Sequence, residues 1–151
     1  MTALKITDVA PSVSDVELNE LETRFGFSFP EDLRQHYLHF NGGRPVPNLF
    51  PRGDEYFPVN EFLPIKHGMR GTRFEDTYVD LIQGNEFFPK NLIPIASDSG
   101  GDYFCYSLEP GKIGAICFYQ SDYYDDPSRA VVCLADNLEI FLNSLVSDEN
   151  E

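Results

Sequence analysis

Residues 92–108 read LIPIASDSGGDYFCYSL. The apolar run Leu92–Ala96 stops at a polar turn of serine, aspartate and glycine, and a second apolar run, Tyr103–Leu108, begins straight after it. Aspartate and serine side chains bond the backbone of turns, and glycine adopts the positive φ angles that turns require. The stretch therefore predicts two strands separated by a tight turn, and it carries no obvious catalytic side chain.

Strands continue from here to the last helix. The motif Glu109–Lys112 has proline at its second position and glycine at its third, which suits a type II turn and predicts an antiparallel hairpin between Tyr103–Leu108 and Ile113–Tyr119. A last strand is expected at Ala130–Leu134. Asp136 is expected to cap the final helix, whose apolar stripe comprises Leu138, Phe141, Leu142 and Leu145.

Helices dominate the first forty residues. Ser14 and Glu17 form the two ends of a capping box, so a helix is expected to begin after Ser14 and to end at Gly26. Pro30 suits the first turn of a second helix, which the Asn41-Gly42-Gly43 motif stops. Both helices carry an apolar face that can contribute to a core.

The middle of the chain is less regular. Prolines punctuate residues 44–58, which predicts a long loop or a set of short edge strands. A strand is expected at Val59–Ile65, and a capping box at Thr72–Glu75 then predicts a helix that extends to about Gln83. Because the strands cluster between helices and do not alternate with them, the chain is assigned to the α+β class.

Length and charge limit the classes of function. At 151 residues the chain suits one domain. We expect an arm at residues 1–12, a folded domain at residues 13–146 and an acidic tail at residues 147–151. The formal net charge of −14 disfavours binding to nucleic-acid phosphates or to an anionic membrane surface. It favours a basic protein partner, although solubility alone is the other interpretation of so acidic a composition.

Cysteine usage and the start of the chain indicate a compartment. Cys105, Cys117 and Cys133 each lie inside an apolar run, and their odd number indicates reduced, buried thiols. The first thirty residues lack a basic segment followed by an apolar one, and no apolar stretch is long enough to span a bilayer. We therefore expect a cytoplasmic protein.

Clustered carboxylates are the first candidate for a functional site. Asp98 and Asp102 flank a glycine-rich turn that lacks a lysine, so they are expected to bond the turn itself rather than to surround a phosphate. Together with Asp122, Asp125 and Asp126, these side chains could instead bind a hard cation such as calcium or magnesium, although their spacing is not that of an EF-hand.

The segment 122–126, which reads DYYDD, is the second candidate because it mixes rings with charge. Exposed tyrosines suit protein interfaces, since each contributes a large, fairly rigid surface with a polar tip. Tyr123 and Tyr124 could therefore contact a partner, while the neighbouring carboxylates pair with its Arg or Lys side chains. The other interpretation is a solvated loop whose tyrosines fold back on the sheet, and the sequence favours neither.

Several short motifs, taken in order, resemble a known family. The motifs are Glu20-Leu21-Glu22, Phe25-Gly26, Phe29-Pro30 and Asn41-Gly42-Gly43, then Leu92–Ala96 with Asp98 and Gly100–Asp102, the Pro110-Gly111 hairpin and the closing Leu138–Leu145 helix. Over about residues 12–146, the chain resembles the SUKH superfamily, in its cell-wall-assembly-regulator branch. The resemblance implies a single α+β domain in which N-terminal, middle and C-terminal helices pack around a twisted, mostly antiparallel sheet.

The resemblance also implies a function. Many bacterial members of the superfamily are immunity proteins, which bind a toxin domain, often a nuclease, and block it in the cell that makes it. We therefore expect a non-catalytic domain with no cofactor or metal. Its expected partner is a basic toxin domain of the nuclease class. The residues expected to contact this partner are Asp54, Glu55, Asp98, Asp102, Asp122, Tyr123, Tyr124, Asp125 and Asp126. Two alternatives remain: a regulatory scaffold without a toxin partner, and a metal-dependent hydrolase that uses the clustered carboxylates.

Overall fold

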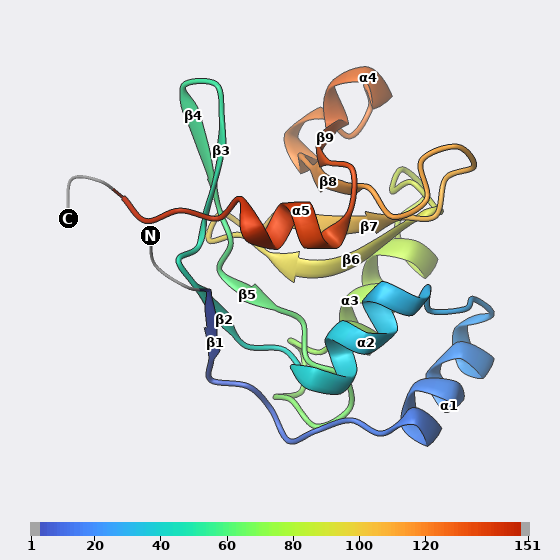
Figure 1. Cartoon of the computed structure of the whole chain (residues 1–151). Helices are drawn as coiled ribbons and strands as arrows, with labels where there is room; N and C mark the ends of the chain where they lie inside the picture. The colour runs from blue at the N-terminus through green and yellow to red at the C-terminus, as the bar shows by residue number, and fades with distance from the viewer. Residues whose placement is uncertain (1–3, 149–151) are drawn as a thin grey trace.

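The computed structural model of the protein describes residues 4–148 (Figure 1). Its elements, in chain order, are β1 (Lys5–Thr7), α1 (Asp15–Phe25), α2 (Glu31–His39), β2 (Arg44–Val46), β3 (Leu49–Arg52), β4 (Glu55–Pro58), β5 (Glu61–Phe62), α3 (Phe74–Tyr78), the π-helix η1 (Val79–Gln83), β6 (Leu92–Ser97), β7 (Tyr103–Ser107), β8 (Ile116–Tyr119), the 3₁₀ helix η2 (Ser121–Tyr123), α4 (Pro127–Ala130), β9 (Val131–Ala135) and α5 (Leu138–Asn143). In the view of Figure 1, α5 crosses in front of β7, with β8 and β9 above it, and α1 and α2 lie below the sheet.

The central sheet has five strands in the order β5-β6-β7-β8-β9, and every neighbouring pair is antiparallel. Each of β6, β7 and β8 pairs with the next strand along the chain, so β6 to β9 form a meander. The register places Tyr103 opposite Tyr119, and Cys117 opposite Cys133. The predicted α+β class is confirmed, and the sheet is antiparallel as the family resemblance implied.

Two of the predicted strands are shorter than expected. The strand predicted at Val59–Ile65 is limited to β5. The amide of Leu63 still donates to the carbonyl of Ile95 in β6, but Pro64 has no amide and the amide of Ile65 donates to the side chain of Asn41. The strand predicted to start at Ile113 starts three residues later, as β8. Here Gly114 adopts a φ of +96°, so the chain turns a second time before the strand begins.

Short helices occupy the connection between β8 and β9, which contains the DYYDD segment. Because α4 ends at Ala130, the strand expected to start there starts at Val131. Helix α5 also starts later than expected. Its N-cap is Asn137 and not Asp136, since the Asn137 side chain accepts a hydrogen bond from the amide of Ile140 at 2.8 Å.

The proline-rich segment 44–58 forms short strands, which was one of its two interpretations. Strand β2 pairs with β1, which lies within the arm expected at residues 1–12. Strands β3 and β4 form a hairpin that projects from the body of the protein (Figure 1). Leu49 of β3 also exchanges two backbone hydrogen bonds with Val146, at 3.1 and 2.8 Å, so the chain that follows α5 is joined to the hairpin.

Helix α1 has the predicted capping box. The Ser14 hydroxyl accepts from the amide of Glu17 at 3.1 Å, and the Glu17 carboxylate accepts from the amide of Ser14 at 3.0 Å. Gly26 ends the helix with a φ of +75°. The Glu17 carboxylate also lies 3.1 Å from Lys66 Nζ and 2.8 Å from His67 Nε2, so it joins α1 to the chain that follows β5.

Helix α3 does not begin at the predicted capping box of Thr72 with Glu75. Its N-cap is Arg73, and the reciprocal side chain is Asp76, whose carboxylate accepts from the amide of Arg73 at 3.2 Å. Glu75 is buried and accepts from the amide of Lys66 at 3.1 and 2.9 Å, so it is not available for a cap. The helix continues directly into η1, and its predicted end is confirmed.

Aromatic rings fill much of the core. Against α5, the ring centroid of Phe141 lies 5.2 Å from that of Phe50 and 5.6 Å from that of Phe104. Between α2 and α3, the centroids of Tyr37 and Phe74 lie 6.1 Å apart in an edge-to-face contact. All five side chains are buried, so rings contribute to the packing of the sheet against α5 and of the helices against each other.

The Asn41-Gly42-Gly43 motif follows α2 and joins it to the chain before α1 and to the chain after β5. We call the part of the protein that contains α1, α2 and α3 the helical half. Asn41 is only 3 % exposed; its Oδ1 accepts from the amide of Ile65 at 2.7 Å, and its Nδ2 donates to the carbonyls of Ile65 and Pro11, each at 2.8 Å. Both glycines have positive φ angles, and a Cβ would approach Pro64 to 2.8 Å at the first or Ile6 to 2.7 Å at the second. The backbone can make this close approach only because both positions are glycine.

We predict that Asn41→Ala lowers the free energy of unfolding by about 3 kcal/mol or more, because it leaves the buried amide and carbonyl of Ile65 and the part-buried carbonyl of Pro11 without this partner. The matched control is Asn48→Ala, which removes one bond, from Asn48 Nδ2 to the carbonyl of Val59 at 3.2 Å. The control should cost about 1 kcal/mol. Urea unfolding of both variants measures the two losses, and equal losses would contradict the prediction.

Glu17 predicts a pH dependence of stability. Hydrogen bonding from the amide of Ser14, and next from Lys66, lowers the pKa of Glu17 from 4.5 to about 2, and His67 acts in the same direction. A carboxylate whose pKa is lower in the folded state contributes stability that is complete above the unfolded pKa and is lost as pH falls through the folded pKa.

Glu17→Gln is therefore expected to lower the Tm at neutral pH. The difference in Tm between the variant and the wild type should shrink as the pH falls from 4.5 to about 2, because the wild-type carboxylate becomes protonated over that range. Thermal unfolding followed by circular dichroism at several pH values measures this difference. A difference that stayed constant to the lowest pH would argue against the assigned role of the carboxylate.

Candidate protein-binding surface

The residues expected to contact a partner lie in three places. Asp54 and Glu55 are at the tip of the β3–β4 hairpin, which in Figure 1 stands toward the opposite end of α5 from α4. Asp98 and Asp102 flank the turn between β6 and β7, and the remaining five lie in the connection between β8 and β9. The structure brings the second and third places together, because the amide of Ser121 donates to Asp102 Oδ1 at 3.1 Å.

Carboxylates of this set stabilise the turns to which they belong. Asp98 Oδ1 accepts from the amides of Gly100 at 3.0 Å and Asp102 at 2.8 Å, which is the turn-bonding role that the sequence predicted. Asp126 caps α4, since its Oδ1 accepts from the amide and the hydroxyl of Ser128 at 3.2 and 2.6 Å. A substitution at any of these aspartates would therefore change the local backbone as well as the charge.

The two tyrosines have different surroundings. The side chain of Tyr123 is covered by Arg129, whose guanidinium carbon lies 4.0 Å from the ring centroid. Tyr124 is 48 % exposed, and its ring meets that of Phe87 edge-on, with the centroids 4.9 Å apart. Tyr123 thus packs against the protein, whereas Tyr124 offers a large part of its surface to solvent.

Phe87 is an exposed ring that the sequence analysis missed. It is 51 % exposed, although its neighbour Phe88 is buried and packs on Tyr119 with the centroids 4.6 Å apart. The side chain of Asn85 accepts from the amide of Phe87 at 2.9 Å and so holds the loop between η1 and β6. The Phe87-Phe88 doublet was the available signal, because a core position for one ring leaves the adjacent ring near the surface.

We call these residues the acidic aromatic patch: the exposed rings of Phe87 and Tyr124, together with the exposed carboxylates Glu86, Asp122 and Asp125. The two rings come from loops that are distant in sequence and meet only in the folded protein. Exposed apolar surface surrounded by charged groups is typical of a site that binds another protein. The patch can therefore offer contact area and negative charge to one partner.

A groove between α2 and α5 is a second concave surface. Its volume is about 380 Å³. Most of its lining surface is apolar. The apolar side chains that line it are Leu4, Phe40, Leu138 and Leu142, and the carboxylates are Asp32 and Glu139. The groove could not be predicted from the sequence, because it depends on how two helices from opposite ends of the chain approach each other.

His36 lines this groove as a buried, neutral side chain. Burial lowers the pKa of His36 to about 4; the charge of His39 acts in the same direction, and that of Asp32 opposes it. Within residues 4–148, His36 Nε2 and the Tyr119 hydroxyl are the buried side-chain polar atoms that lack a hydrogen-bond partner. At neutral pH, His36 therefore adds no positive charge to the groove.

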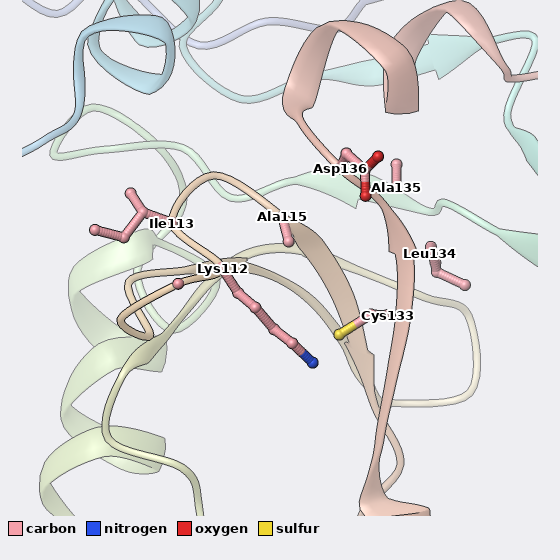
Figure 2. A pocket seen from close by; sticks show the side chains of 8 residues that line it. Lys112, Ile113, Ala115, Cys133, Leu134, Ala135 and Asp136 are labelled. Atoms are coloured by element: carbon pink, nitrogen blue, oxygen red, sulfur yellow. The ribbon is translucent and has the colours of Figure 1, made fainter.

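The three cysteines are free thiols that differ in burial. Cys105 and Cys117 are buried as predicted, but Cys133 is exposed, which corrects the prediction for that residue. The reason is topological, because Cys133 lies on β9, which forms an edge of the sheet. A cavity of about 430 Å³ adjoins Cys133 and is also lined by Lys112 and Asp136 (Figure 2).

Within the described range 4–148, no group of three or more histidine, cysteine, aspartate or glutamate side chains is arranged to hold a metal ion. Over the same range, no helix combines the length and the apolar character needed to cross a bilayer.

Comparison with known proteins identifies the family. Residues 12–144 match the SMI1 / KNR4 family (SUKH-1). The chain is also 34 % identical, over 162 aligned residues, to the SPbeta prophage-derived uncharacterized protein YokK of Bacillus subtilis (strain 168), and the alignment covers 93 % of this chain and 79 % of that relative. The family match extends from the start of the helical half to the last helix. The chain therefore belongs to the SMI1 / KNR4 (SUKH-1) family, as the order of its motifs indicated.

Proposed function

We propose that this protein is an immunity protein: a non-catalytic domain that binds a basic toxin domain, of the nuclease class, in the cytoplasm and covers its active site. The acidic aromatic patch is the observation that carries the proposal. Family membership supports a protein partner, because the resemblance to the SUKH superfamily implies a binding domain and many of its bacterial members are immunity proteins.

The rings of the patch provide the contact area. Phe87 and Tyr124 each leave about half of their surface in water, and transfer of that apolar surface into an interface is favourable. Aromatic side chains are enriched among the residues that dominate binding energy. The edge-on contact between the two rings also restrains them before binding, so less conformational entropy is lost when a partner arrives.

The carboxylates of the patch provide selectivity for a cationic partner. An enzyme that cleaves nucleic acid needs cationic side chains to hold phosphates, and Glu86, Asp122 and Asp125 can pair with such side chains. The net charge of −14 attracts the partner at a distance and raises the rate of encounter. Since screening limits this attraction to roughly 8 Å at physiological ionic strength, contacts at the patch decide which partner stays bound.

Blocking the toxin by occlusion requires only a stable interface. A standard interface buries about 800 Å² on each partner, and the described chain has an accessible surface of 8377 Å². In this proposal Asp98, Asp102 and Asp126 maintain the turns that support the patch. The hairpin tip, with Asp54 and Glu55, lies apart from the patch. It is a second contact for a partner that is large enough to reach both places.

We predict that Asp122→Asn/Asp125→Asn weakens binding at least about tenfold, or about 1.4 kcal/mol, and that Tyr124→Ala costs about 2 kcal/mol. The partner is first captured from the native cells at low salt with the full chain as bait, and calorimetry then measures the affinity. The matched control, Glu20→Gln/Glu31→Gln, removes the same charge from exposed positions on α1 and α2. Equal weakening by the two double variants would contradict a specific patch.

A growth assay tests the immunity role separately. Expression of the captured partner should arrest a host cell, co-expression of this chain should restore growth, and the Tyr124→Ala variant should protect less well. The role would be wrong if the partner were harmless to the cell, or if the intact chain bound it but gave no protection.

A further inference from the structure

Two of the three thiols face each other at the edge of the sheet. Cys117 of β8 lies directly opposite Cys133 of β9, and their Sγ atoms are 2.7 Å apart. Directly opposed residues of antiparallel strands have Cα atoms about 4.5 or 5.5 Å apart and project from the same face. A disulfide spans Cα separations of about 4.4–6.8 Å, so this pair can be cross-linked with both strands in place.

The thiols differ in their access to solvent. Cys133 is exposed on the edge strand, whereas Cys117 is only 1 % exposed. Cys105 lies on β7, the other neighbour of β8, and is paired with Cys117 there. It is fully buried, and its Sγ lies 3.9 Å from the carbonyl of Tyr103. A dissolved reagent can therefore reach Cys133 first, and Cys117 is the thiol that Cys133 can then contact.

A cation adjoins the pair. Lys112 extends toward Cys133 in Figure 2, and both residues line the same two cavities. The thiolate is the nucleophilic form of cysteine, and exchange with a disulfide begins from it. Burial, and next the hydrogen bond with Cys133, raises the pKa of Cys117 to about 12, while Lys112 acts in the opposite direction. Cys117 thus keeps its proton at neutral pH and can donate it to the neighbouring sulfur.

We propose that Cys133 and Cys117 form a modification site for low-molecular-weight disulfides, in which Cys133 is the attacking thiol and Cys117 the resolving thiol. An accessible cysteine beside both a cation and a second cysteine is typical of sites that respond to oxidation. The proposal does not depend on the binding of a toxin.

The reaction consists of two thiol–disulfide exchanges. In the first, the Cys133 thiolate attacks one sulfur of the reagent RSSR; a bond from Cys133 to SR forms, the RS–SR bond breaks, and the released RS⁻ takes up the proton that Cys133 had lost. In the second, Cys117 gives up its proton as its sulfur attacks Cys133 Sγ; the protein disulfide forms, the Cys133–SR bond breaks, and the departing RS⁻ takes up that proton. Two protein thiols are oxidised, and RSSR is reduced to two RSH.

The disulfide closes a ring over residues 117–133, which contains η2, α4 and the connection that bears Tyr124. Such a ring restricts the unfolded chain, and the oxidised protein should therefore unfold at a Tm about 5–10 °C above that of the reduced protein. Oxidation also fixes the distance between the two ends of this connection. An excess of the small thiol RSH reverses the change by the same two exchanges.

Mass spectrometry of the full chain after incubation with oxidised glutathione tests the proposal. The wild type should lose two hydrogen atoms and yield a non-reduced peptide pair that joins Cys117 to Cys133. Cys117→Ser should stop after the first exchange and retain one glutathionyl group, and Cys133→Ser should remain unmodified. The matched control, Cys105→Ser, should form the disulfide as the wild type does.

Cys117→Ala also removes the resolving thiol, and it places an apolar side chain at the buried position. Like Cys117→Ser, it should therefore retain one glutathionyl group. Circular dichroism confirms that each variant is folded. The proposal is overturned if the folded wild type stays unmodified or keeps a glutathionyl group, or if the cross-link includes Cys105. It is also overturned if folded Cys133→Ser acquires glutathione.

Discussion

The hydrogen bonds of Asn41 are the constraint on which the helical half depends. One side chain at the end of α2 bonds the backbone of both Pro11 and Ile65, and so fixes the entry to α1 relative to the exit from β5. The chain that leaves β5 then supplies the Lys66 amide, which donates to the Glu75 carboxylate, and the side chains of Lys66 and His67, which contact the Glu17 carboxylate. A carboxamide suits this position because it offers a donor and an acceptor together.

Sequence patterns predicted the structure well where the bonding groups lie a few residues apart. The capping box of Ser14 with Glu17 and the turn bonded by Asp98 are of this kind, because each side chain meets a nearby amide. Predictions failed where a distant group competed for the same bond. Glu75 bonds the backbone beyond β5 instead of capping α3, and the side chain of Asn41 bonds the amide of Ile65, where the sequence predicted strand pairing.

The candidate surface could be predicted in composition but not in assembly. The DYYDD segment indicated Tyr124 as a contact residue, but Phe87 joins it only because the loop before β6 and the loop after β8 meet in the fold. Spacing alone also could not separate Asp126, which caps a helix, from Asp122 and Asp125, which are exposed. That distinction requires the hydrogen-bond partners of each carboxylate, which depend on the backbone path.

The backbone bridge between Leu49 and Val146 affects the order in which the chain can reach this structure. The meander needs only strands that follow one another, so its loops close at a small entropic cost. The bridge instead joins Leu49, in the first third of the chain, to Val146, in the segment after α5. This pairing of distant residues raises the contact order of the fold. A nascent or clipped chain that ended before Val146 could complete the meander, yet its β3 edge would remain open to pairing with another strand.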